Sequence, residues 1–138
     1  MDLLKKMCSI HAPSGNEAGM TRFLLDYIRK NMKNWAVTPE IYSGKGFQDC
    51  IVLVFGKPRT AIFAHVDSIG FTVRYGKELV KIGGPRTIDG FKLVGEDSKG
   101  KVTATLRVPT DKKTHETKLE YDCKRELERG TELTFKPD

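Results

Sequence analysis

His65 and Asp67 are the residues whose types and spacing could carry chemistry in this chain, because an imidazole and a carboxylate two positions apart suit a metal site. In an extended segment, side chains two positions apart project to the same side, so Asp67 can accept the proton of the imidazole nitrogen that binds no metal. This contact fixes the tautomer of His65 and raises its basicity. The spacing alone leaves a second interpretation open, a structural histidine at the end of a buried strand.

The segment before His65 indicates where the pair lies. Residues 60–64 read Thr-Ala-Ile-Phe-Ala and show no polar alternation, which is typical of a strand covered on both faces. We therefore expect His65 at the carboxyl end of a central strand, the edge at which open α/β sheets bind their ligands.

Two helices and two further strands are expected before this segment. Residues 1–10 carry a short helical stripe, and Ser14 with Glu17 has the S-x-x-E form of a capping box that starts a second helix. The apolar face of that helix has a spacing of three and four residues and consists of Met20, Phe23, Leu24, Tyr27 and Ile28. Extended patterns follow at 36–42 and 50–56.

The pattern changes near Gly70, where we place a domain boundary. Short β-type runs recur about every ten residues, which favours a small antiparallel barrel or sandwich; they cover 71–75, 79–82, 91–94, 101–108, 118–121 and 132–135. Only 123–129 suggests a short helix, and 109–116 reads as a loose loop. The predicted fold class is α/β: residues 1–69 form the N-terminal part of a helix-covered mixed sheet, and residues 70–138 form a small antiparallel β-barrel insert domain.

Composition narrows the class of protein. The 138 residues are 38% hydrophobic, enough for a core, and no stretch approaches the roughly 20 apolar residues of a membrane span. The N-terminus becomes charged too early for a secretory signal, so we expect a cytoplasmic protein without membrane partners. The net charge of +6 is spread evenly: residues 1–70 hold nine basic and six acidic residues, and residues 71–138 hold fifteen and twelve. An even spread without a basic stripe argues against nucleic acid as a partner.

The remaining candidate residues predict little chemistry. We expect His11 to cap or pack locally in the turn between the helices, and His115 to be solvated. Three cysteines with no CxxC spacing indicate neither a disulfide framework nor a cysteine zinc cluster, so we expect small apolar fillers.

Four segments together resemble one family. They are CSIHAPSGNE (8–17), AHVDSIGF (64–71), VKIGGP (80–85) and ELERGTELTFKP (126–137), in that order and over nearly the whole chain. They resemble the opening of the glutamyl, deblocking and tetrahedral aminopeptidases, which are co-catalytic zinc metallopeptidases formerly also described as endoglucanases.

The resemblance implies a peptidase α/β domain interrupted after the H-x-D strand by a β-barrel used in subunit association and substrate access. It implies two zinc or cobalt ions, with His65 as a metal ligand and Asp67 as the candidate catalytic residue behind it. Peptides would be the substrates, hydrolysed at the N-terminal residue by a metal-activated water, and a homo-oligomer would be the assembly.

Two departures from the family pattern matter. Ser68 stands where relatives usually have a glutamate, which alters the hydrogen bonding near the site. The bridging aspartate, the general-base glutamate and the other ligands of relatives have no counterpart in these residues. We therefore expect an N-terminal fragment that is inactive by itself and binds little or no metal. The alternative is a non-catalytic binding or assembly module that retains the barrel.

Overall fold

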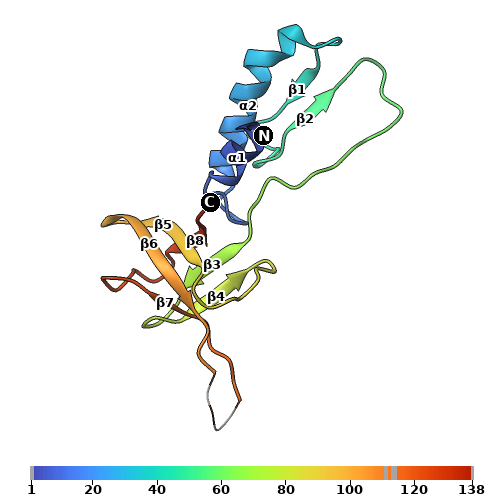
Figure 1. Ribbon diagram of the computed structural model, residues 1–138. Coiled ribbons are helices and arrows are strands. Elements are labelled where there is room, and N and C mark those ends of the chain that lie inside the picture. The colour runs from blue at the N-terminus through green and yellow to red at the C-terminus, as the bar shows by residue number, and fades with distance from the viewer. Residues whose placement is uncertain (1, 111, 113–114, 138) are drawn as a thin grey trace.

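The structure is a computed structural model that describes residues 2–110, 112 and 115–137. It combines α-helices with β-strands in two parts: two helices and a two-stranded sheet, and a curled antiparallel sheet (Figure 1). Of the expected loop 109–116, positions 111, 113 and 114 lie outside the described residues. Thr110 and Thr117 form an antiparallel bridge on either side of them.

The first part begins with helix α1 (Asp2–Cys8), then α2 (Ala18–Asn31) and the 3₁₀ turn η1 (Met32–Asn34). Met20 and Ile28 of the predicted apolar face of α2 are buried, and its other members are half-buried. Among the described residues, no helix has the length and apolar character needed to cross a membrane.

The predicted capping box is wrong. Helix α2 starts after Glu17, and no side chain caps its first turn. The Glu17 carboxylate accepts instead from the backbone N–H of Gly15 at 2.7 Å, and the Ser14 hydroxyl is bonded elsewhere. The capping box does not form because the carboxylate of Asp67, far away in the sequence, accepts the hydrogen bond of the Ser14 hydroxyl.

Strands β1 (Glu40–Tyr42) and β2 (Val52–Val54) form an antiparallel pair in which Ile41 lies opposite Leu53. Both fall within the predicted extended segments 36–42 and 50–56 but are shorter. Only these two strands belong to this sheet in the part of the chain that the structure describes.

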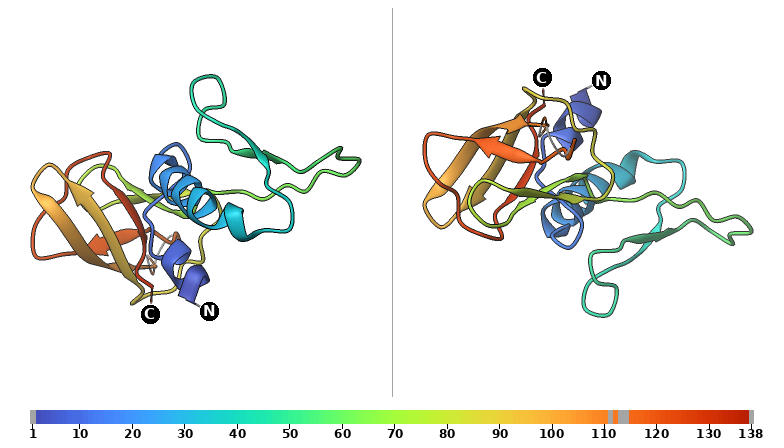
Figure 2. Two further views of the ribbon diagram at one scale, coloured as in Figure 1. Left: turned by 90° about the horizontal axis from the view of Figure 1, so that it is seen from above. Right: turned by 90° about the horizontal axis from the view of Figure 1, so that it is seen from below.

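The prediction of a doubly buried strand at Thr60 to Ala64 is wrong. No regular structure forms there, and Ile62 and Phe63 are 94% and 91% exposed. The physical reason is that a strand needs hydrogen-bonded neighbours, and among the described residues 57–67 make no backbone hydrogen bond to another segment. Both views of Figure 2 show the turn after β2 reaching out beyond the other elements before the chain returns toward β3.

The second part is a six-stranded antiparallel sheet with the order β4-β3-β8-β5-β6-β7. Its strands are β3 (Gly70–Val73), β4 (Leu79–Ile82), β5 (Lys92–Asp97), β6 (Gly100–Arg107), β7 (Glu120–Asp122) and β8 (Glu132–Phe135). The sheet curls until its outer strands meet: Leu79 N–H donates to Leu119 O at 2.7 Å, and Tyr121 N–H donates to Lys77 O at 3.0 Å. The expected antiparallel β-structure after Gly70 is confirmed as this curled sheet.

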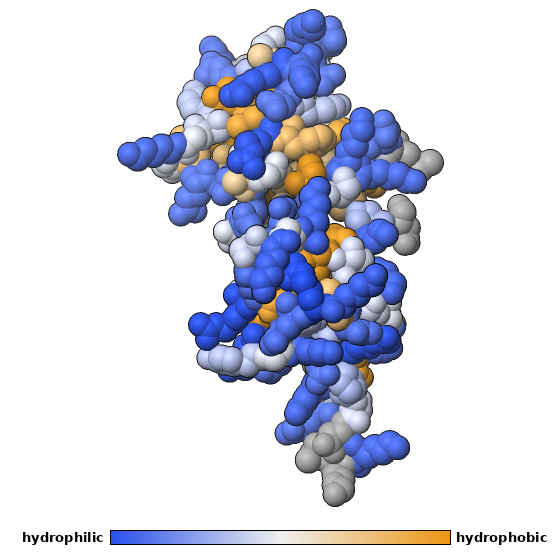
Figure 3. Space-filling view, turned by 90° about the vertical axis from the view of Figure 1, so that its left-hand side faces the viewer, coloured by the Kyte–Doolittle hydropathy of each residue, from blue (hydrophilic) through white to orange (hydrophobic). Residues whose placement is uncertain are grey.

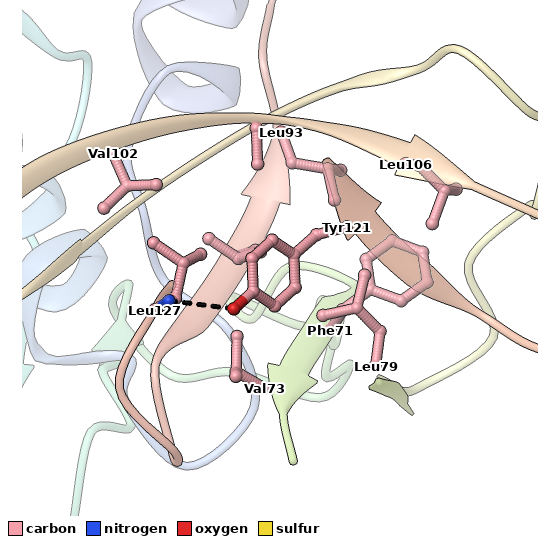
Figure 4. Close-up of a cluster of buried hydrophobic side chains, with 10 residues drawn as sticks. Phe71, Val73, Leu79, Leu93, Val102, Leu106, Tyr121 and Leu127 are labelled. Atoms are coloured by element: carbon pink, nitrogen blue, oxygen red, sulfur yellow. Dashed lines mark hydrogen bonds between the residues drawn. The ribbon is translucent and has the colours of Figure 1, made fainter. Parts of the chain in front are cut away.

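The curl encloses the main hydrophobic core. Strand β6 shows the alternation that produces it, with Val102, Ala104 and Leu106 buried and their neighbours directed outward. The other core residues come from the remaining strands and the loop before β8: Phe71, Val73, Leu79, Leu93, Tyr121, Leu127 and Leu133 (Figure 4). A Cβ at Gly70 or Gly95 would clash with a backbone carbonyl of β8, so these glycines permit the close packing of the strands.

The predicted short helix at 123–129 does not form. Side-chain contacts hold this segment in an irregular loop: Leu127 N–H donates to the Tyr121 hydroxyl at 2.8 Å, and Arg125 binds both carboxylate oxygens of Asp97 at 2.5 and 2.6 Å. The Arg125 guanidinium lowers the pKa of Asp97 to about 2. Figure 4 shows the Tyr121 hydroxyl reaching Leu127 from within the core.

Tyr121→Phe tests the contact between the core and this loop. The change leaves the buried Leu127 N–H without its acceptor, so we expect the free energy of unfolding to fall by about 1–3 kcal/mol. Tyr75→Phe is the matched control, because Tyr75 is 65% exposed and should change stability by less than about 0.5 kcal/mol. Denaturant unfolding of both variants measures this, and equal stability of the two would contradict it.

Candidate functional site

His65 and Asp67 are in contact in the structure. The Nδ1 atom of His65 lies 3.0 Å from the backbone oxygen of Asp67 and 3.2 Å from its carboxylate Oδ1. Both partners can only accept a hydrogen bond, so the proton of the neutral imidazole must reside on Nδ1. The Nε2 atom then keeps its lone pair, which is the form of histidine that binds a metal ion.

The loop before α2 holds this pair in place. Ser68 N–H donates to Ala12 O at 2.7 Å, and Pro13 and Ser68 form a parallel bridge. The Ser14 hydroxyl donates to Oδ2 of Asp67, the oxygen that His65 does not use. Asp67 is thus fixed from both sides, by Ser14 and by His65.

Sequence reasoning did not identify Ser14 as a site residue. It lies 53 positions from Asp67, and its spacing to Glu17 pointed to a local helix cap. The two segments were linked only by their resemblance, at 8–17 and 64–71, to parts of the same family. No spacing rule connects them.

The contacts around Asp67 favour its ionised form. The hydrogen bond from Ser14 is the largest cause that lowers the pKa of Asp67, and its own backbone N–H and the nearby His65 lower it further, against a smaller opposing effect of burial. The Asp67 side chain is 33% exposed, whereas that of His65 is 84% exposed. A negative carboxylate therefore lies behind an imidazole that faces solvent.

Ser68 has an unusual environment. Its Oγ atom is buried and has no hydrogen-bond partner among the described residues. This serine is the position at which the aminopeptidases that the sequence resembles usually have a glutamate. The structure therefore places an unsatisfied hydroxyl directly beside the His65–Asp67 pair.

Concave apolar surface surrounds the pair. One cavity of about 690 Å³ is lined by α2, β2 and the segment Ile62–Asp67, and a second of about 430 Å³ by α1, α2 and the segment Ala64–Ser68. Figure 3 shows apolar side chains at the surface of the part that contains the helices. Four of the apolar side chains that line these two cavities, Leu4, Val52, Ile62 and Phe63, are each at least 44% exposed.

The described residues fit one ligand of a metal ion but do not fit a two-ion site. Nε2 of His65 is a suitable donor by its chemistry. Among the residues that the structure describes, no group of three or more His, Cys, Asp or Glu side chains lies close enough together to hold a metal ion.

The other candidates lie apart from this pair or differ from expectation. His11 does not pack locally: its Nδ1 lies 2.9 Å from Thr134 Oγ1 in β8, and burial lowers its pKa. Cys8 and Cys50 are exposed, so the interpretation of these two as apolar fillers is wrong. His115 is exposed, as expected.

Ser14→Ala should raise the pKa of Asp67, because it removes the hydrogen bond that lowers this pKa most. The folded-state pKa lies below the ordinary value, so Asp67 contributes stability above the unfolded-state pKa of about 4, and that stability is lost as the pH falls through the folded-state pKa. The variant should show a smaller loss of stability on acidification. NMR titration of the Asp67 carboxyl carbon measures the pKa. Ser9→Ala is the control, because the Ser9 hydroxyl donates to the Lys6 carbonyl, away from Asp67. An unchanged Asp67 pKa in Ser14→Ala would contradict the assignment.

Comparison with known proteins adds no assignment to this geometry. The sequence matches no protein-family model and no curated protein. Support for a function therefore comes from the residues themselves and from the contacts described above.

Proposed function

We propose that the chain is the N-terminal portion of a metal-dependent aminopeptidase, a cytoplasmic hydrolase that removes N-terminal residues from peptides. His65 supplies one imidazole ligand to one of two divalent ions, zinc or cobalt, in the intact protein. Asp67 is a positioning residue that holds the ring by Nδ1. The observation that supports this best is that two oxygens of Asp67, its backbone O and its Oδ1, accept from Nδ1 of His65. This leaves the lone pair of Nε2 for a metal.

The rest of the two-metal site is proposed to come from residues outside this chain. The donors described here fit a single ligand position, and one imidazole does not retain two ions. The chain alone is therefore proposed to have no peptidase activity and feeble metal affinity.

The finer fold is proposed on the same grounds. Residues 1–69 would be the beginning of a helix-covered mixed peptidase sheet, in which 60–64 becomes a strand once neighbours pair with its edges. Residues 70–138 would be the insert. The apolar character of Ile62 and Phe63, both almost fully exposed here, supports a strand that is covered in the intact protein. These two exposed apolar side chains also support association of copies into a homo-oligomer.

A second candidate function is a non-catalytic binding or assembly module. The curled sheet favours it, because its strands enclose a hydrophobic core of their own without any residue from the helices. In that case His65 would have no metal to bind.

Titration with zinc or cobalt distinguishes the two proposals. The chain should bind weakly through His65, and His65→Ala should abolish the chemical-shift changes that the metal causes around residues 64–68. Asp67→Asn should weaken binding by about 10–100-fold, as is usual for the hydrogen-bond partner of a metal-binding histidine. His115→Ala, at an exposed histidine of the β6–β7 hairpin, should bind like the unmodified chain. Equal binding by the unmodified chain and His65→Ala would remove His65 from the site and favour the module.

A further inference from the structure

A cavity of about 670 Å³ lies in the second part of the molecule, where β5 begins and β8 ends. Its lining comes from four places in the chain, the residue before β3, the loop after β4, the start of β5 and the end of β8; the residues are Ile69, Gly84, Arg86, Gly90, Phe91, Lys92, Phe135 and Lys136. None of these residues belongs to the His65–Asp67 pair. The volume lies within the range of small-molecule pockets.

One wall of the cavity is aromatic and fixed. The rings of Phe91 and Phe135 meet edge to face, with centroids 5.6 Å apart and planes at 89°. Phe135 also meets Phe71 edge to face at 5.7 Å, and Phe71 is completely buried in the core. Because the core ring fixes Phe135 and Phe135 packs on Phe91, the wall is preformed.

The rim of the cavity is positive. Arg86 and Lys136 are exposed, and neither forms an ion pair with an acidic residue among those that the structure describes. Asp89, the acidic residue nearest to Arg86 in sequence, is engaged by Arg107 at 3.3 Å and by Val108 N–H at 3.0 Å. No described lining residue is acidic. The cavity therefore combines an apolar wall with two cations, Arg86 and Lys136, that form no ion pair with an acidic side chain in the part of the chain that the structure describes.

Lys92 differs from the other two cations. Its Nζ atom donates to Thr105 Oγ1 at 2.8 Å, across the β5–β6 pair. This bond ties its ammonium group to the residue directly opposite on β6. Arg86 and Lys136 are therefore the cations available to a ligand.

We propose that this cavity binds the C-terminal residue of a peptide that ends in an apolar or aromatic side chain. The side chain packs on Phe91 and Phe135, and the terminal carboxylate is bound by Arg86 and Lys136. A guanidinium presents paired N–H donors that match the two oxygens of a carboxylate. The aromatic wall favours this ligand over a bare anion such as phosphate, which gains nothing from apolar contact. The inference does not depend on the metal site.

N-acetyl-phenylalanine and its amide test the proposal, because they differ only at the terminal group, which is a charged carboxylate in the first and an uncharged carboxamide in the second. The acid should bind the full chain about tenfold more tightly than the amide, since a hydrogen bond to a charged group is the interaction that the amide loses. Free phenylalanine, whose ammonium group lies near the same cations, should bind less tightly than the acetylated acid. Isothermal titration calorimetry gives the affinities, and NMR shifts of Ile69, Phe91 and Phe135 locate the ligand.

Three variants assign the roles. Arg86→Gln should weaken binding of the acid about tenfold and leave the amide unchanged, whereas Phe91→Ala should weaken both ligands. Both side chains are exposed or at the edge of the core, at 37% exposure for Phe91, so the fold should persist. Lys101→Gln, at an exposed lysine of β6 outside the cavity lining, is the matched control and should bind like the unmodified chain.

Three results would overturn the proposal. Equal affinity for acid and amide would remove the carboxylate from recognition. Inorganic phosphate bound as tightly as N-acetyl-phenylalanine would show that charge alone acts. An equal effect of Lys101→Gln and Arg86→Gln would show a general effect of net charge instead of a site.

Discussion

An extended backbone becomes a strand only when neighbouring segments form hydrogen bonds with it. This requirement decides whether the apolar segment before His65 is a covered strand or an exposed loop. Residues 60–64 have the sequence of a buried strand, but among the described residues the whole segment 57–67 makes no backbone hydrogen bond to another segment. Their apolar side chains therefore remain at the surface, as Ile62 and Phe63 show. The exposure of the candidate site has the same cause, because His65 lies at the end of this segment and its side chain faces solvent.

At Asp67 and Ser68 the chain forms hydrogen bonds with the loop before α2. Ser14 and the Ala12 carbonyl hold Asp67 and Ser68, and Asp67 in turn orients the imidazole of His65. The curled sheet starts at Gly70 and has its own core, so its stability does not depend on pairing of the segment. His65 is therefore oriented by Asp67 and Ser14 even though the segment before it forms no strand.

Local patterns predicted the features that local forces decide. The extended segments that contain β1 and β2, the β-type run that contains β6 and the contact of Asp67 with His65 all follow from spacings within one or two elements. The patterns failed where a distant residue decided the outcome. Ser14 prefers a carboxylate 53 positions away to its expected cap, and 60–64 has a strand's composition without the partners that make a strand. The cavity beside Phe91 and its cationic lining could not be predicted, since four separate segments form it.

Sedimentation velocity tests most directly whether residues 60–64 are an apolar segment that must be covered by a partner. An apolar face with a free backbone edge should draw copies together, so we expect association that increases with concentration in the micromolar range. Ile62→Lys with Phe63→Lys should reduce this association, because both side chains are almost fully exposed and the charges oppose pairing. Ile88→Lys, at an exposed position in the loop before β5, should leave it unchanged. A sharply monomeric and stable species for the unmodified chain would contradict the account.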